Sequence, residues 1–284
     1  MNGGRSPLRV LSLGAGVQST TVLLMSCVGQ LPRLDAAVFA DTGWEPSRVY
    51  SHLEWLEAEA RSHGIPVHRV SHGDLRAEVL RQIDARPVKQ SWTSIPLYVL
   101  NPDGSKGMIQ RQCTRAYKVR PVDRFIRTRL LGLRPKQRAP ANAVDHWFGI
   151  SCDEMLRIRH SSVRWKRHEY PLCNYPAVYI DRPMTRADCI AWLDRNYPGR
   201  DVPRSACIGC PFRSDAEWRW LREQAPCEWN EMVGIDHAVR RLPGMHGSVF
   251  FHPRRIPLDA AVPALSATDV ADKWINECTG LCGI

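Results

Sequence analysis

The stretch that decides the fold is Leu8-Arg-Val-Leu-Ser-Leu-Gly-Ala-Gly-Val-Gln-Ser19. Its first part, Leu8 to Leu13, is mostly apolar and β-prone, and small residues from Gly14 to Gly16 end the predicted strand. A helix is predicted from about Gln18 to Ser26, because apolar residues recur there with helical spacing. The stretch therefore predicts a strand, a tight turn and a helix.

The same alternation continues along the chain. Further strands are predicted at 36–40, 67–70 and 144–150, and Pro46 can open a helix between the first two of these. Strands alternating with helices favour an α/β fold with a doubly wound parallel sheet. We expect a nucleotide-binding domain over residues 1–180 and a mostly helical, cysteine-bearing region with a mobile tail over 181–284. Capping boxes at Thr185–Asp188 and Ser214–Glu217 predict helix starts in the second region.

Composition excludes several classes of protein. The chain has 284 residues, of which 44% are hydrophobic, so it can bury a substantial core. The sequence has no apolar run of about 18 residues, so no membrane span is predicted. The N-terminus lacks the features of a signal peptide, so we expect a cytoplasmic protein. Its ten cysteines are then not expected to form a disulfide framework.

The net charge of +10 favours a polyanionic partner, either nucleic acid or a phosphorylated small molecule. Residues 157–170 combine Arg and Lys with Trp165 and Tyr170, which would stack on bases. A second basic stretch runs from Arg124 to Arg138. The alternative for both stretches is a solvated surface. A homodimer is also a candidate assembly.

The loop that follows the first strand has the composition of an anion cradle. Gly14 and Gly16 let the backbone approach an anion closely, and the helix N-terminus offers free N–H groups. Ser19 adds a hydroxyl donor. In open α/β sheets, ligands bind at this carboxyl end of the strands. The alternative is a tight strand-to-helix turn with no ligand.

Five segments, in order, resemble one superfamily. Gly14-Ala15-Gly16-Val17-Gln18-Ser19 stands where PP-loop ATP pyrophosphatases have Ser-Gly-Gly-x-Asp-Ser, and 39–45 resembles the Asp-Thr-Gly segment of phosphoadenylyl-sulfate (PAPS) reductases. Residues 111–121, 149–157 and 207–212 resemble the group's Cys-Thr…Lys…Pro, Gly-x-x-x-Asp-Glu-x-x-Arg and CxxCP segments. The chain thus resembles PAPS reductase-like proteins, a group that includes ATPases of DNA phosphorothioation and many phage-encoded proteins.

The resemblance implies an adenine nucleotide alpha hydrolase-like fold that binds ATP, or an adenylyl nucleotide, with Mg. It assigns nucleotide binding to Ser12, Gly14, Ala15, Gly16, Gln18, Ser19, Asp41, Thr42, Gly43, Lys118 and Arg157, and a catalytic role to Asp153. Gln18 replaces the aspartate of the usual loop, so ATP cleavage and simple binding of an adenylyl group both stay open. For Asp41 the alternative is an Asx-turn between strand and helix.

The cysteines suggest a metal or redox centre. Cys207 and Cys210 have the spacing that lets two thiolates face one metal, and Cys113 is the third candidate ligand. A [4Fe–4S] cluster, a zinc ion and a metal-free redox pair stay open, and Cys278, Cys282 or a histidine would be the fourth zinc ligand. The tail loosely resembles the mobile Glu-Cys-Gly tail of PAPS reductases, which predicts Cys278 and Cys282 as nucleophile and resolving thiol. Cluster ligation, or no role at all, are the alternatives.

Three functions follow. The first is an ATP-dependent sulfurtransferase that adenylates a nucleobase, nucleotide or nucleic acid and takes sulfur from a donor protein through a cysteine-bound cluster. The second is an adenylyl-sulfate or PAPS reductase that uses a tail cysteine and a thiol reductant protein. The third is a nucleic-acid-binding module with a structural metal and no catalytic activity.

Overall fold

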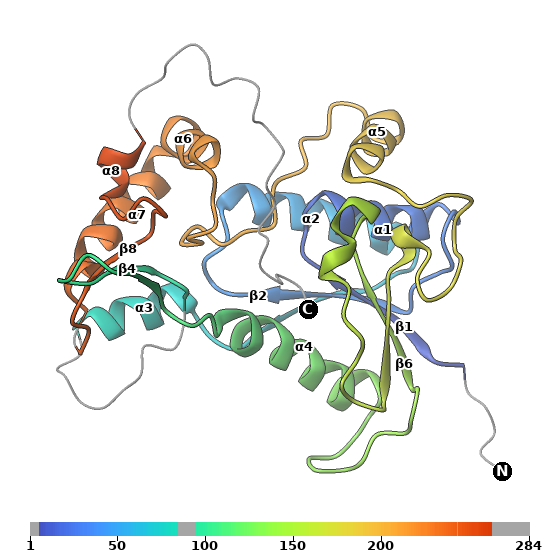
Figure 1. The fold of residues 1–284 in the computed structure, drawn as a ribbon. Coiled ribbons are helices and arrows are strands. Elements are labelled where there is room, and N and C mark those ends of the chain that lie inside the picture. The colour runs from blue at the N-terminus through green and yellow to red at the C-terminus, as the bar shows by residue number, and fades with distance from the viewer. Residues whose placement is uncertain (1–5, 85–94, 243, 263–284) are drawn as a thin grey trace.

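A computed structural model describes residues 6–84, 95–242 and 244–262 (Figure 1). Five parallel strands form the central sheet in the order β3-β2-β1-β6-β7. The bounds of these strands are Leu8–Leu13 for β1, Ala36–Asp41 for β2, Val67–Ser71 for β3, Val144–Phe148 for β6 and Lys166–Glu169 for β7. The α/β fold with a doubly wound parallel sheet is confirmed.

Helices cover both faces of this sheet (Figure 1). One face packs against α1 (Val17–Cys27), α2 (Ser47–Ser62) and α5 (Arg186–Asn196). The opposite face packs against a helical run made of η1 (Thr114–Val119), α4 (Arg120–Phe125) and η2 (Ile126–Leu130), of which η1 and η2 are π-helical.

The alternation of β1 explains the two layers. Leu11 and Leu13 belong to the core under α1, whereas Val10 belongs to the core over α4. Successive side chains of a strand point to opposite faces, and both faces here are buried. That is why the stretch reads as a nearly continuous apolar run.

A second hydrophobic core lies beside the sheet. It contains Trp44 and Tyr117 together with residues of the later helices. A three-stranded antiparallel sheet, β5-β4-β8, borders it, and its central residues 98–100 pair with 106–108 on one side and with 248–250 on the other. The remaining elements are α3 (Leu75–Asp84), β4 (Tyr98–Leu100), β5 (Lys106–Met108), η3 (Cys152–Arg157), η4 (Pro171–Cys173), α6 (Asp215–Gln224), α7 (Pro226–Ala238), η5 (Val239–Arg241), β8 (Ser248–Phe250) and α8 (Leu258–Ala261).

Both predicted capping boxes are confirmed, at the starts of α5 and α6. A continuous helical run begins at Thr114 and includes Pro121, which lies just after the π-helical segment η1. Strands β4 and β5 lie outside the strands predicted from the sequence. None of the helices described in the structure is both long and apolar enough to cross a membrane.

Candidate functional site

A pocket opens at the carboxyl end of the central sheet, between β1 and β6. Ser12 and Leu13 end β1, and Phe148, Gly149 and Ile150 end or follow β6; all five line the pocket. Strand β1 has β2 on one side and β6 on the other, so the chain changes direction across the sheet at this point. Loops diverge at such a switch point and leave a crevice, which is where open α/β sheets bind ligands.

The glycine loop forms one wall of the pocket. Gly16 is the N-cap of α1, and the Ser19 hydroxyl accepts a hydrogen bond from the Gly14 amide (3.2 Å) and donates one to the Gly16 carbonyl (3.3 Å). Ser19 therefore fixes the turn from inside. The first N–H groups of α1 have no partner within the helix, which suits an anion in the pocket.

Close backbone approaches explain the glycines around this loop. A Cβ on Gly14 would lie 2.7 Å from the Ser205 hydroxyl, and a Cβ on Gly16 would lie 2.9 Å from the Ser205 Cβ. On the β6 side, a Cβ on Gly149 would lie 2.5 Å from the Ser19 backbone nitrogen. Larger side chains at these three positions would push the loop, β6 and the Ser205 segment apart.

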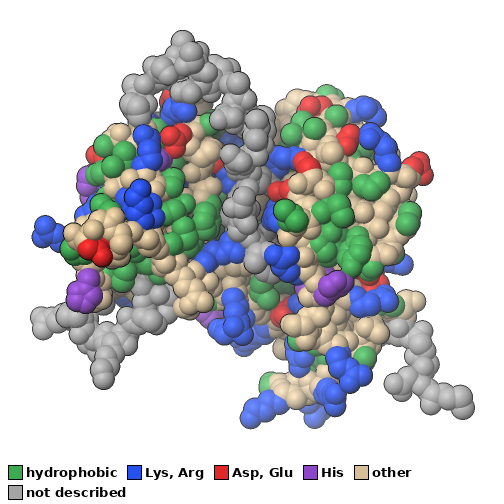
Figure 2. Space-filling view, in the orientation of Figure 1, with side chains coloured by type: hydrophobic (Ala, Val, Ile, Leu, Met, Phe, Trp, Pro, Cys, Tyr) green, Lys and Arg blue, Asp and Glu red, His purple; other side chains and the backbone are tan. Residues whose placement is uncertain are grey.

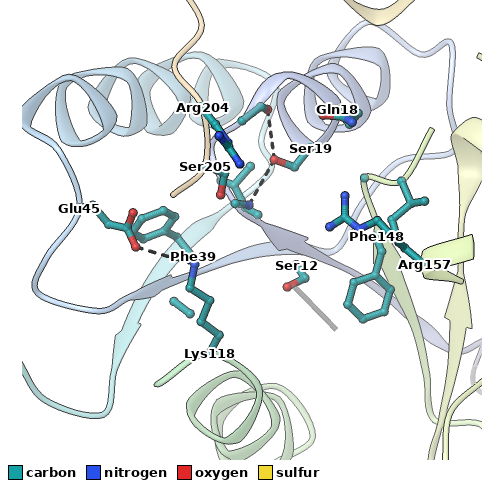
Figure 3. Close-up of a pocket in the computed structure, with 16 residues that line it drawn as sticks. Ser12, Gln18, Ser19, Phe39, Glu45, Lys118, Phe148, Arg157, Arg204 and Ser205 are labelled. Carbon is teal, nitrogen blue, oxygen red and sulfur yellow. Dashed lines mark hydrogen bonds and ion pairs between the residues drawn. The ribbon is translucent and has the colours of Figure 1, made fainter. Parts of the chain in front are cut away.

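Three cations face the pocket from three separate segments (Figure 3). Lys118 comes from η1, Arg157 from η3 and Arg204 from the loop before α6. Glu45 is the only carboxylate among the residues that line this pocket. The Lys118 Nζ lies 3.9 Å from the Glu45 Oε1. Arg157 and Arg204 also form ion pairs with Glu154 and Glu217, which do not line the pocket. The lining itself thus holds three cations and one carboxylate beside a helix N-terminus, a combination that favours a phosphorylated ligand.

Gln18 connects the glycine loop to the Arg157 segment. This side chain is 3% exposed; its Nε2 donates to Glu154 Oε2 at 2.9 Å, and its Oε1 accepts from Arg186 Nη1 at 2.9 Å. Glu154 in turn accepts from Arg157 Nη1 at 2.7 Å. The amide can bridge an acid and a base because it donates at one end and accepts at the other. An aspartate is shorter and would only accept hydrogen bonds here.

The loop after β2 uses its side chains internally. The Asp41 carboxylate accepts a hydrogen bond from the Gly43 amide at 2.8 Å, which defines an Asx-turn. It also accepts one from the Tyr50 hydroxyl at 2.8 Å. The Thr42 hydroxyl donates to Glu45 Oε1 at 3.0 Å. Asp41, Thr42 and Gly43 do not line the pocket as described, whereas Glu45 from the same segment does. The turn geometry thus matches the alternative interpretation of this segment.

Cys207 lies against that loop. Its thiol donates to Glu45 Oε1 at 3.3 Å and lies 3.4 Å from the Thr42 hydroxyl. Burial, and then the negative charge of Glu45, raise the pKa of Cys207 well above its usual value, while Lys118 acts in the opposite direction. The thiol is therefore protonated at neutral pH in this arrangement.

The segment that carries Cys207 and Cys210 is held rigidly. The Arg213 guanidinium is buried and donates to the carbonyls of Ala206 (3.0 Å), Cys207 (2.9 Å) and Ile208 (3.2 Å). Burial lowers the pKa of Arg213 to about 10, so it stays charged at neutral pH.

The three cysteines predicted as ligands of a metal or cluster lie in one region of the structure but do not form a metal site among the described residues. Cys207 and Cys210 share one turn, and Cys113 and Cys207 pack at the same hydrophobic core. However, over the ranges that the structure describes, no three His, Cys, Asp or Glu side chains gather as a metal site requires. Cys278 and Cys282 lie outside the described residues. The cysteine geometry thus supplies a partly buried thiol next to the pocket, and the metal stays a prediction.

Other predicted residues lie elsewhere. Asp153 accepts from the Arg186 amide at 3.1 and 3.2 Å at the first turn of α5, and it does not line the described pocket. Ala15 is fully buried in the core under α1. The prediction that Trp165 and Tyr170 stack on bases is wrong, because their exposed fractions are 8% and 0%. Their apolar rings pack inside the protein instead.

Two pocket residues, Arg204 and Ser205, were not predicted from the sequence. They precede the CxxC segment, and the only local signal available for them is a basic residue beside a serine close to a cysteine motif. Their position over the glycine loop depends on the long chain path from β7 through α5, which no local pattern specifies.

Comparisons with protein-family models, with curated proteins and with solved structures find no match to this chain. The site is therefore interpreted from its own residues.

Proposed function

We propose that the protein is an ATP-dependent adenylating sulfurtransferase acting on a nucleobase, nucleotide or nucleic acid. The observation that carries this proposal is the pocket at the switch point, where a glycine loop, a helix N-terminus and three cations surround one space. The partly buried thiol of Cys207 contacts Glu45, one of the residues that line this pocket. The pocket lining supports the binding of a polyphosphate. The position of the Cys207 thiol beside it gives weaker support for thiol chemistry.

In the proposal, different residues of the pocket bind the phosphates of ATP and offset their charge. The N–H groups at the start of α1 and the Ser205 hydroxyl hold the pyrophosphate part of the nucleotide, with Lys118, Arg157 and Arg204 offsetting its charge. Stronger interactions with developing charge than with the ground state would speed the reaction. Gln18 keeps Arg157 in place through Glu154.

The proposed chemistry has two balanced steps. An oxygen of the acceptor attacks the α-phosphorus of ATP, the bond to the bridging oxygen breaks, and pyrophosphate leaves. A sulfur nucleophile at the oxidation level of hydrosulfide then adds to the adenylated carbon, and AMP leaves with the electron pair of the carbon–oxygen bond. No external oxidant or reductant is needed in this sequence.

The experiment that tests this proposal identifies the products formed from ATP. The protein is incubated with α-labelled ATP, Mg²⁺, hydrosulfide and a mixture of cellular RNA and DNA. AMP and pyrophosphate are expected, together with sulfur in the nucleic acid, and Lys118→Ala should lower the rate about 10- to 100-fold through the loss of one charged contact. ADP and phosphate as the products would contradict the proposal.

A second measurement decides the form of the sulfur centre. Iron, zinc and acid-labile sulfide are assayed in protein purified without oxygen, alongside Cys207→Ser. About four iron and four sulfide per chain, lost in the variant, are expected for a cluster. One zinc without sulfide would remove the cluster and favour a structural site, and sulfite released from an adenylyl sulfate with a thiol reductant would favour the reductase.

A further inference from the structure

The positive charge of this protein is concentrated in one segment. Residues 111–138 hold ten Lys and Arg and a single acid, Asp123, which gives this segment a net charge of +9. The whole chain has a net charge of +10, so the rest of the sequence is close to neutral. A basic composition that only improved solubility would not need to be confined in this way.

The structure places this charge along one helical run. Seventeen residues, Thr114–Leu130, form η1, α4 and η2 without a break. Val122 and Ile126 bury the inner side of the run against the sheet. The outer side is exposed at Arg115, Arg120, Arg124 and Arg129.

The only acid of the segment is neutralised within the protein. The Lys166 Nζ donates to Asp123 Oδ1 at 2.5 Å, and Lys166 itself is 7% exposed. Asp123 therefore does not offset the outer arginines. Charge that is not offset attracts a polyanion, and it does so most strongly at low ionic strength.

Both ends of the helical run extend this surface. At its start, Lys118 lines the candidate site. At its end, the loop that leads to β6 exposes Arg134 and Arg138. Figure 2 shows Lys and Arg side chains gathering in the lower part of the molecule, over α4 and this loop. The helical run alone spans on the order of 25 Å at 1.5 Å per residue, so several consecutive phosphates of a strand fit along it.

The exposed side chains favour one class of polyanion. No large hydrophobic residue of segment 111–138 is exposed, and helices that bind membrane surfaces need an exposed apolar face. No aromatic residue of the segment is exposed either, so base stacking is absent from this surface. What remains is a set of exposed guanidinium groups, which are well suited to phosphodiesters.

We propose that Arg115, Arg120, Arg124, Arg129, Arg134 and Arg138, the arginine surface, bind the phosphodiester backbone of a nucleic acid and lead that strand to the pocket. The inference rests on the proposed function in one respect, because it names a nucleic acid as the acceptor. Contacts to phosphates alone make the binding independent of sequence and strongly dependent on salt.

The experiment compares two variants with the same net charge. One is R115Q/R120Q/R124Q/R129Q, and the control is R9Q/R61Q/R195Q/R241Q, whose arginines are exposed in other parts of the structure. Binding to labelled 20-nucleotide single-stranded DNA, single-stranded RNA and duplex DNA is measured by fluorescence anisotropy at several salt concentrations. Anionic phospholipid vesicles serve as the competing probe, and circular dichroism checks that both variants fold.

Loss of binding only in the first variant is expected, on the order of 100-fold at 0.1 M salt, with the slope of log K against log salt reduced by about 3. The three oligonucleotides show which form of nucleic acid binds best. Equal losses in both variants, no oligonucleotide binding by the unaltered protein at low salt, or binding to vesicles alone would each overturn the inference.

ATP binding by the same variants separates this inference from the proposed function, because neither variant alters a residue that lines the pocket. Oligonucleotide binding without ATP binding would support the arginine surface and contradict the nucleotide site. ATP binding without oligonucleotide binding would do the reverse.

Discussion

The loops after β1 and β2 leave neighbouring strands of the same sheet, yet they are built differently. The β1 loop, Gly14–Gly16, has little side chain and offers backbone amides to the pocket. The side chains of the β2 loop form internal hydrogen bonds: Asp41 accepts from Gly43 and Tyr50, and Thr42 donates to Glu45. The first loop lines the pocket with its backbone, whereas the second contacts the Cys207 segment.

Gly149→Ala should damage the β1 loop most. The added Cβ would meet the Ser19 nitrogen at 2.5 Å and the Ser19 Cα at 2.6 Å, and neither backbone atom can turn away as a flexible side chain would. We expect a loss of about 3 kcal/mol of unfolding free energy, at the upper end for overpacking, together with weakened ATP binding. Urea denaturation and calorimetric titration measure the two effects.

A matched control for this variant is Gly234→Ala, in α7. Nothing lies within 4 Å of a Cβ at that position. Alanine should stabilise the helix there by about 0.5–1 kcal/mol and leave ATP binding unchanged. Equal stability of Gly149→Ala and the original protein would show that the close approach of β6 to the β1 loop does not constrain the site.

Gly209→Ala should instead disturb the contact between the β2 loop and the Cys207 segment. Its Cβ would overlap the ring of Trp44, which is 2% exposed, and the Ile208 amide donates to the Trp44 carbonyl at 2.8 Å. A loss of about 2 kcal/mol is expected in urea denaturation, with a smaller effect on ATP affinity than Gly149→Ala. If the two variants lowered ATP affinity equally, the division of roles between the loops would be wrong.

His52 tests how α1 is held behind the β1 loop. Its Nε2 lies 3.1 Å from the Thr20 hydroxyl, and burial, followed by the charges of Arg200 and Arg48, lowers its pKa to about 4. The unfolded histidine titrates near 6.5, so below that pH the unfolded chain takes up a proton that the folded protein does not. Stability should be level above pH 6.5 and fall as the pH drops toward 4, by about 2 kcal/mol at pH 5 from this residue.

The measurement is urea denaturation at pH 7.5 and pH 5 for the original protein and for His52→Gln. Other buried histidines, His146 among them, also have lowered pKa values, so the difference between the two proteins isolates His52. A variant that loses as much stability as the original protein between these pH values would rule out the buried neutral histidine.

Cys207 gives the smallest expected effect. Because burial and Glu45 raise the pKa of its thiol, iodoacetamide should modify Cys207 much more slowly than the exposed Cys227. Glu45→Gln removes the negative charge and should speed modification of Cys207 a few-fold without affecting Cys227. Peptide mapping by mass spectrometry follows both sites. Rapid modification of Cys207 in the original protein would contradict a protonated thiol at this position.

The fold was predictable because its signals are local. The apolar run of β1, the glycine turn and the capping serine and threonine residues each act over a few positions, and the structure has them where they were predicted. Lys118 and Arg157, which the resemblance assigned to nucleotide binding, both line the pocket, and the binding itself stays a prediction. Arg204 and Ser205 were missed because tertiary contacts across a long stretch of chain bring them there. Asp41, which the resemblance assigned to nucleotide binding, accepts a hydrogen bond within its own turn, and this contact was the alternative that the sequence left open.

The most direct test of the account is the affinity for ATP and Mg²⁺, measured by calorimetric titration on the original protein, on Arg157→Ala and on Arg159→Ala. Arg157 lines the pocket, whereas Arg159 follows two residues later, is exposed and donates to the carbonyls of Leu156 and Ile158. The account predicts binding by the original protein, a loss of about 10- to 100-fold in Arg157→Ala, and little change in Arg159→Ala. No binding of ATP by the original protein, or equal affinities for all three proteins, would contradict a nucleotide site at the carboxyl end of β1.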